Sequence, residues 1–172
     1  MKPIYIGVDP AFRKGGFWAV VIDMEDRTAR PIAFRDLLDW HDWLRSEEAP
    51  YTAFVAIENS NEQNKNFDME GTGYVIARKG RNVGTNQAVS QLAVVSAIRR
   101  YGASNVFSVS PKQKGRKYSP AEFGAVVRSD GITLMGMWLS QGHENAQDQR
   151  DAYKMAAMAR KMALLTGKFK KI

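Results

Sequence analysis

The chain has 172 residues, of which 44% are hydrophobic and 25% are charged. This length fits one domain, and the composition excludes a disordered chain and a membrane protein, because no apolar run is long enough to span a bilayer. Cysteine is absent, which excludes disulfides, thiolate catalysis and thiolate metal sites. We therefore expect a soluble, cytoplasmic protein without a secretory signal, in which carboxylates would bind any catalytic metal.

Charge is distributed unevenly along the chain. Residues 1–62 contain 7 Lys and Arg against 11 Asp and Glu, whereas residues 63–172 contain 18 against 7, and the net charge is +7. A basic region of this kind favours a polyanionic partner, since each phosphate that Lys or Arg neutralises releases condensed counterions. Nucleic acid is the partner that this charge suggests, although a basic soluble protein without such a partner would also fit it.

The first third of the chain is rich in apolar and β-branched runs, which predict strands. The strands are expected at residues 4–8, 16–23, 29–34 and 52–57. A turn rich in glycine and charge joins the first two, so they should form an antiparallel hairpin. Asp36 can cap a helix over residues 37–44, and the fourth strand, which ends at Glu58, is expected at the centre of the sheet.

The rest of the chain is expected to alternate between helices and a strand. Residues 59–84 are polar and rich in glycine, which predicts a long loop. Helices are expected over residues 85–101, after the capping box Ser119-Pro120-Ala121-Glu122, and over residues 145–165, with a last strand at residues 106–109. A hairpin followed by such alternation predicts a single α/β domain with a mixed sheet, and residues 168–172 a basic tail.

Four carboxylates stand out by their positions. Asp9 and Glu58 each follow a predicted strand, at the edge where open α/β sheets bind ligands. Asp148 and Asp151 lie three residues apart on the last predicted helix, on its apolar side, where a carboxylate is costly unless it is paired or bound to metal. They could also simply complement the helix dipole. Together, four carboxylates could hold two magnesium ions for phosphodiester hydrolysis. His41 and His143 we interpret as structural.

Several motifs occur in an order that resembles RuvC-type Holliday junction resolvases of the ribonuclease H-like superfamily. The motifs are Ile6-Gly7-Val8-Asp9-Pro10, Val55-Ala56-Ile57-Glu58-Asn59, Ser110-Pro111 with a lysine-rich loop, and Asp148-Gln149-Arg150-Asp151-Ala152. The resemblance covers about residues 4–163. It implies a ribonuclease H-like fold with a five-stranded mixed sheet flanked by helices, in the cytoplasm of a bacterial or phage-infected cell. It also implies a homodimer that cuts four-way DNA junctions with two Mg²⁺ ions per active site, which Mn²⁺ can replace, and without a small-molecule cofactor.

The resemblance also assigns roles to individual residues. The metal-binding acids would be Asp9, Glu58, Asp148 and Asp151. A catalytic lysine is implied in the loop after the last strand, where Lys112, Lys114 and Lys117 compete. We expect Lys117, because it lies shortly before the Ser119 helix cap and should therefore be the best anchored. The expected dimer interface is the helix over 85–101, which carries the apolar run Leu92 to Val95.

Basic and aromatic residues near these acids are candidates for binding DNA. They are Lys65, Phe67, Arg78, Lys79, Arg81, Lys112, Lys114 and Arg116. Cations can hold phosphates while an aromatic ring stacks on an unpaired base. Phe67 is therefore a candidate wedge at the junction centre, although it could instead anchor the long loop.

The sequence also departs from the resolvase pattern. Ala11 replaces the usual glycine after Asp-Pro, and the stretch over residues 129–147 is longer than in bacterial resolvases. Both features resemble phage-like versions, which implies that flaps and other branched DNA are accepted as well. Three alternatives are a YqgF-like ribonuclease H-fold nuclease that acts on RNA, an actin-like sugar kinase, and a DNA-binding module without cleavage.

Overall fold

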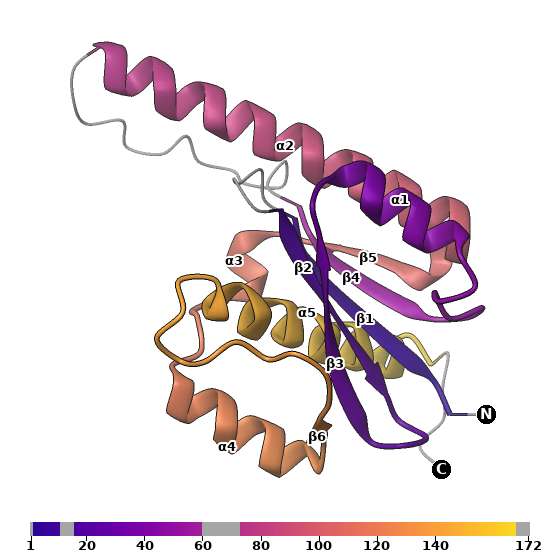
Figure 1. Cartoon of the computed structure of the whole chain (residues 1–172). Coiled ribbons are helices and arrows are strands. Elements are labelled where there is room, and N and C mark those ends of the chain that lie inside the picture. Colours follow the sequence, from indigo (N-terminus) through magenta and orange to yellow (C-terminus); the bar gives the residue numbers. More distant parts are fainter. Residues whose placement is uncertain (1, 11–15, 60–72, 168–172) are drawn as a thin grey trace.

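A single mixed β-sheet lies at the centre of the computed structural model (Figure 1). The structure describes residues 2–10, 16–59 and 73–167, and for residues 73–86 it describes the backbone alone. Its strands are β1 (Ile4–Asp9), β2 (Phe17–Asp23), β3 (Thr28–Phe34), β4 (Phe54–Glu58), β5 (Val106–Val109) and β6 (Thr133–Leu134). Their order is β5-β4-β1-β2-β3-β6. β2 is antiparallel to both of its neighbours, β1 and β3, whereas β4 is parallel to β1 and β5 is parallel to β4.

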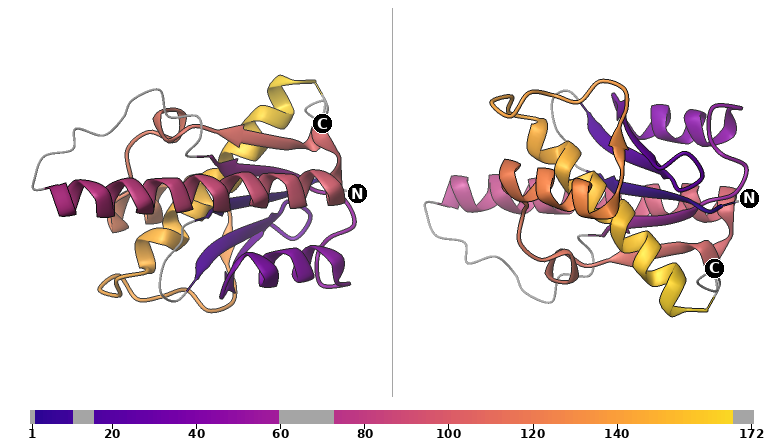
Figure 2. Two further views of the ribbon diagram at one scale, coloured as in Figure 1. Left: turned by 90° about the horizontal axis from the view of Figure 1, so that it is seen from above. Right: turned by 90° about the horizontal axis from the view of Figure 1, so that it is seen from below.

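Helices cover both faces of this sheet. They are α1 (Leu37–Arg45), α2 (Gly73–Tyr101), α3 (Pro111–Lys114), α4 (Pro120–Asp130) and α5 (Ala146–Leu165), with a 3₁₀ turn at Ala103–Asn105. Figure 2 shows α2 crossing one face and α5 with α4 on the other. The core accordingly has two parts, one under α1 and α2 and one under α5. Burial on both faces explains why β1 and β4 are nearly continuous apolar runs.

The expected α/β fold with a mixed sheet is confirmed, but within the described residues the sheet has six strands and not five. The additional strand, β6, pairs in parallel with β3 through Thr133 opposite Thr28 and Leu134 opposite Ala29. Two exposed residues carry no periodic signal, so the sequence could not reveal this strand.

The expected loop over residues 59–84 was wrong in its second part, because α2 begins at Gly73 and not at residue 85. Figure 1 shows why the pattern misled: the first part of α2 extends beyond the sheet, so it needs no apolar side. Nearer the sheet, α2 turns small residues toward the core, with Ala93 and Ala97 fully buried, whereas Leu92 is 51% exposed.

Most other boundaries agree with the sequence. Asp36 caps α1, accepting from the backbone N–H of Asp39. Ser119 and Glu122 form the expected capping box of α4. α5 begins one residue after Asn145 and ends at Leu165. The expected basic tail at 168–172 lies outside the described residues.

Candidate active site

Asp9 and Glu58 are the last residues of β1 and β4. The two strands are parallel neighbours, with Val8 opposite Ile57. Both carboxylates therefore lie at one edge of the sheet, as the sequence predicted.

α5 brings the other two acids to this edge. It packs directly on β1, and a Cβ at Gly7 would lie 2.0 Å from both the carbonyl oxygen of Ala152 and the backbone nitrogen of Ala156. Only glycine permits that approach. Asp148 and Asp151, in the first two turns of α5, are 8% and 2% exposed, so they lie on the packing side of the helix, as expected from the sequence.

Lys114 connects three of the acids. Its Nζ lies 3.4 Å from Asp9 Oδ2 and 3.4 Å from Asp151 Oδ2, and it forms an ion pair with Glu58 Oε2. The lysine side chain is only 9% exposed. Asp148 lies one turn before Asp151 on the same helix. The structure therefore gathers Asp9, Glu58 and Asp151 around one buried ammonium group.

The backbone around Lys114 is held by a short capped helix. Ser110 Oγ accepts from the backbone N–H of Gln113, and the Gln113 side chain accepts from the backbone N–H of Ser110. Pro111 occupies the first turn, and Gly115 ends the helix with a φ of 73°. The stretch after β5, expected as a loop, thus contains α3, which positions Lys114 at its last residue.

The electrostatics of the cluster follow from burial and crowding. Burial, together with the nearby Asp9 carboxylate, raises the pKa of Glu58 to about 7, even though Lys114 opposes the shift. Burial works against the charge on Lys114, but Asp9, Glu58 and Asp151 outweigh it, so the pKa of the ammonium is raised. Lys114 therefore stays charged at neutral pH, whereas Glu58 takes up a proton more readily than an exposed glutamate does.

The carboxylates fit a hard cation by their chemistry. All the candidate ligands are carboxylate oxygens, which suit magnesium or manganese. Glu58 Oε2 is buried and, in the described structure, has no hydrogen bond to accompany its ion pair with Lys114. Within residues 2–10, 16–59 and 73–167, no three His, Asp or Glu side chains are spaced to hold a metal by themselves. Here the lysine ammonium supplies the positive charge among the acids.

Two polar residues to which the sequence analysis gave no role lie beside the acids. Gln147 Nε2 donates to Asp151 Oδ1 at 2.7 Å and thereby orients it toward Lys114. Asn59, next to Glu58, is buried, and its Nδ2 donates to Ser108 Oγ at 3.0 Å. The spacing of Gln147 and Asp151, four apart on one helix, is the one signal that could have revealed the first contact.

Among the described residues, the other basic candidates of this stretch form no ion pair with Asp9, Glu58 or Asp151. Lys117 was expected to be the best anchored of the three lysines, and this was wrong, since it is exposed whereas Lys114 is buried. Lys112 is exposed as well. Arg116 forms an ion pair with Glu122 of α4, at 2.5 Å. A catalytic role for Lys117 stays a prediction, but Lys114 is the lysine that the fold brings to the acids.

The remaining candidates for DNA binding cannot be placed as side chains. Lys65 and Phe67 lie outside the described residues. The expectation that Arg78, Lys79 and Arg81 lie in a loop was wrong, because they belong to α2; their side chains are outside the described set. Their roles stay predictions.

Neither histidine contacts the acids in the described structure. His143 Nδ1 accepts from the backbone N–H of Asn145 at 3.1 Å, which agrees with a structural role. His41 is half-buried on α1.

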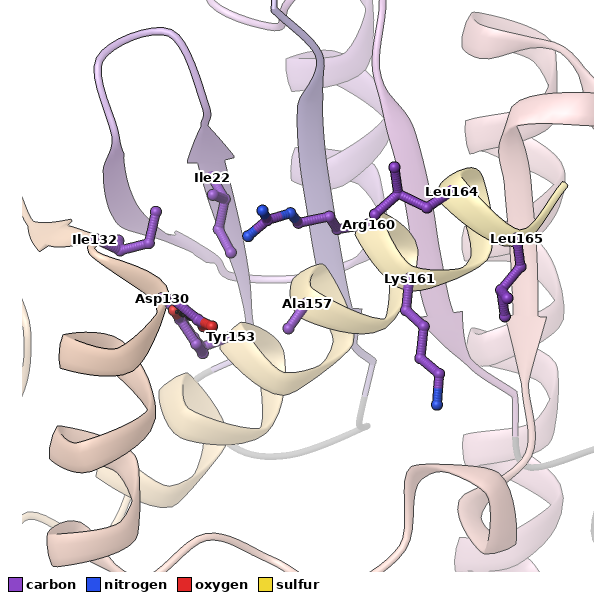
Figure 3. Close-up of a pocket in the computed structure, with 9 residues that line it drawn as sticks. All are labelled: Ile22, Asp130, Ile132, Tyr153, Ala157, Arg160, Lys161, Leu164 and Leu165. Atoms are coloured by element: carbon purple, nitrogen blue, oxygen red, sulfur yellow. Dashed lines mark hydrogen bonds between the residues drawn. The ribbon is translucent and has the colours of Figure 1, made fainter. Parts of the chain in front are cut away.

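A pocket of about 330 Å³ lies along the second half of α5 (Figure 3). In it Tyr153 donates to Asp130 Oδ2 at 2.7 Å, and burial raises the pKa of Tyr153. Ile22, which also lines it, lies opposite Tyr5 near the start of β1. The pocket is thus at the other end of the sheet from Asp9 and Glu58, and it is not part of the acid cluster.

Comparison with known proteins adds no assignment. No family model and no curated protein matches this sequence. Among the helices of the described residues, none has the length and apolar character needed to cross a bilayer.

Proposed function

We propose that the chain is a metal-dependent nuclease of the ribonuclease H-like type, related to RuvC-type resolvases, that cuts branched DNA including four-way junctions. The observation that carries this proposal is the cluster of Asp9, Glu58 and Asp151 around Lys114. These residues come from four separate elements, and all of them belong to motifs of the resolvase pattern. Buried and crowded acids at the edge where open α/β sheets bind ligands are typical of functional sites.

The strand order gives further support. β5-β4-β1-β2-β3, with an antiparallel hairpin and two parallel strands beyond it, is compatible with a ribonuclease H-like sheet. β6 is an addition at the β3 edge, formed by the long stretch between α4 and α5. That stretch is the one in which the sequence resembles phage-like versions.

The proposed reaction is hydrolysis of a phosphodiester bond. Asp9, Glu58, Asp148 and Asp151 would hold magnesium after their side chains move from the spacing described above, in which Lys114 lies among three of them. When bound, the metal would activate water and stabilise the leaving oxygen. Gln147 keeps Asp151 in position through its hydrogen bond. Gly7 allows α5 to approach, and this fixes the spacing between the acids of the helix and those of the strands.

Lys114 replaces Lys117 in the proposed mechanism. It remains protonated at neutral pH and is held by α3 beside the acids. Its ammonium can donate to an oxygen of a phosphate that approaches the acids, and this would stabilise charge as it builds up in the transition state.

A homodimer remains part of the proposal, because two coordinated cuts need two active sites at a fixed spacing. Within the apolar run of α2, Ala93 and Val94 are buried in the core, and Leu92 is half exposed. Leu92 is therefore the most exposed residue of that run, with Val95 half-buried, and it is the best placed to contact a second copy.

The test uses synthetic four-way junctions, flaps and plain duplex, incubated with the protein in magnesium and resolved on denaturing gels. We expect paired nicks in the junction, weaker cutting of flaps and little cutting of duplex. A matched RNA substrate tests the YqgF-like alternative. Binding without any nicking in magnesium or manganese would leave a DNA-binding module and refute the nuclease.

A further inference from the structure

A second charged region lies between α1 and α2, on the face of the sheet opposite α5. It is a pocket of about 510 Å³ lined by His41, Leu44, Arg45, Ser96, Arg99 and Arg100. Three of these six residues are arginines and one is a histidine. No carboxylate belongs to the lining, as far as the described residues show.

Packing of the two helices fixes the shape of this pocket. α1 is anchored on α2 through Trp40, which is fully buried and donates from Nε1 to the carbonyl oxygen of Ala93 at 3.3 Å. His41 and Arg45 are four residues apart on α1, so they share one side of that helix. Ser96 and Arg99 share a side of α2 in the same way. Rigid elements therefore hold the basic residues together.

One of the arginines is tied to the fold. Arg100 Nη2 donates to the carbonyl oxygens of Ala49 and Pro50, each at 3.5 Å, and its guanidinium lies 5.8 Å from the ring centre of Tyr51. Its Nε is buried and has no hydrogen-bond partner in the described structure.

The other two arginines of the pocket have no comparable hydrogen bonds to the backbone among the described residues. Arg45 and Arg99 are exposed, and neither has a carboxylate within 4 Å among the described residues. Cations gathered without a counterion repel one another, and an anion would remove that repulsion. Guanidinium groups bind phosphate through paired hydrogen bonds, so a phosphate group is the anion that fits best.

The pocket is close enough to the acids to contact the same nucleic acid. Gln91 of α2 lies 3.5 Å from Asn59 Nδ2, the residue after Glu58. Ser96 and Arg100 follow Gln91 by five and nine residues, or about 8 to 14 Å along a helix. A strand that reaches the acids can therefore continue along α2 to the arginines.

We propose that the pocket between α1 and α2 binds a backbone phosphate of DNA at a distance from the bond that is cut. This rests on the proposed function only for the identity of the nucleic acid. A free phosphate ion or nucleotide offers the same chemistry, but a connected strand adds the contacts at the acids and should bind far more tightly.

The test compares Arg45→Glu, Arg99→Glu and the double variant with Arg30→Glu, an exposed arginine of β3 outside the pocket. Affinity for a labelled junction and for duplex is measured by fluorescence anisotropy in EDTA, so that cleavage plays no part. We expect about a tenfold loss for each pocket variant and a salt slope lower by about one unit per lost phosphate contact. Arg30→Glu, with the same change of net charge, should lose about twofold or less.

Other outcomes would overturn the proposal. Pocket variants no weaker than Arg30→Glu would show that only net charge matters. If millimolar inorganic phosphate shifts the NMR signals of Ser96 and Arg99 while the variants bind DNA normally, the ligand is a small anion. Sedimentation showing that Arg45→Glu or Arg99→Glu loses a dimer would make the pocket a contact between copies. Circular dichroism melting checks that each variant is folded.

The proposed function can fail separately. A wild-type protein that never nicks DNA, yet binds it through Arg45 and Arg99, would refute the nuclease and keep the phosphate pocket. A double variant that still nicks and binds junctions as the wild type does would keep the nuclease and refute the phosphate pocket.

Discussion

Two regions of this molecule bring like charges together, and the repulsion between those charges is balanced differently in each. At the sheet edge, carboxylates surround Lys114, which lies 3.4 Å from both Asp9 and Asp151. Between α1 and α2, arginines gather without a carboxylate in the described lining. The acid cluster carries its own counterion, whereas the basic pocket needs a counterion from outside. We infer that chemistry depends on the first region and DNA affinity mainly on the second.

The largest expected effect comes from removing one acid. Asp9→Asn or Asp151→Asn should lower the nicking rate in magnesium at least about a thousandfold, because a metal ligand is lost. DNA binding should stay equal or become tighter, since a negative charge facing phosphate is removed. The measurements are single-turnover nicking and anisotropy, with exposed Asp26→Asn as the matched control. Near-native nicking by either variant would remove that acid from the metal site.

A change under α5 should disturb the acid cluster through the backbone. Gly7→Ala would place a methyl group 2.0 Å from backbone atoms of α5, so the helix must move away from β1. We expect a loss of unfolding free energy of about 3 kcal/mol or more, comparable to severe overpacking. Urea unfolding measures it, with Gly124→Ala as control, where the nearest atom is 3.5 Å away on a flexible side chain. A loss below 1 kcal/mol would mean that α5 does not pack as described.

Lys114 and Lys117 both follow β5, but Lys114 is buried beside the acids and Lys117 is exposed. Replacing each of them tests whether the buried cation takes part in cutting. Lys114→Ala should lower the single-turnover rate at saturating protein about a hundredfold, since a donor to developing charge is lost. Lys117→Ala should cut at nearly the native rate, with at most a modest loss of affinity. The reverse result would restore the original choice of Lys117.

The two lysines also show what the sequence can and cannot predict. Strand ends and helix periodicity located Asp9, Glu58 and Asp151, because these positions follow from local patterns and from the parallel pairing of β1 with β4. Choosing Lys114 over Lys117 required the direction in which α3 turns. That direction depends on the Ser110 and Gln113 capping box and on the positive φ of Gly115.

The α1 and α2 region was harder to predict for a related reason. The apolar run Leu92 to Val95 suggested an interface with a second copy, but two of its residues, Ala93 and Val94, are buried in the core of the chain itself. The pocket between α1 and α2 joins residues more than fifty positions apart in the chain. The packing of α1 on α2, to which Trp40 contributes, brings Arg45 and Arg99 together.

The smallest expected effect is a pH dependence of stability in the metal-free protein. The pKa of Glu58 is raised from 4.5 to about 7 in the folded chain, so the folded state binds this proton more tightly than the unfolded state does. The resulting stability is fully present below about pH 4.5 and is lost as the pH rises through 7. Glu58→Gln lacks this dependence and keeps Asp9 and Asp151 beside Lys114. The free energy of unfolding of Glu58→Gln relative to that of the wild type should therefore rise by on the order of 1 to 3 kcal/mol between pH 5 and pH 8. Urea unfolding in EDTA measures this difference. The control is the exposed Glu47→Gln, and a gain no larger than its own would show that the acids do not crowd Glu58.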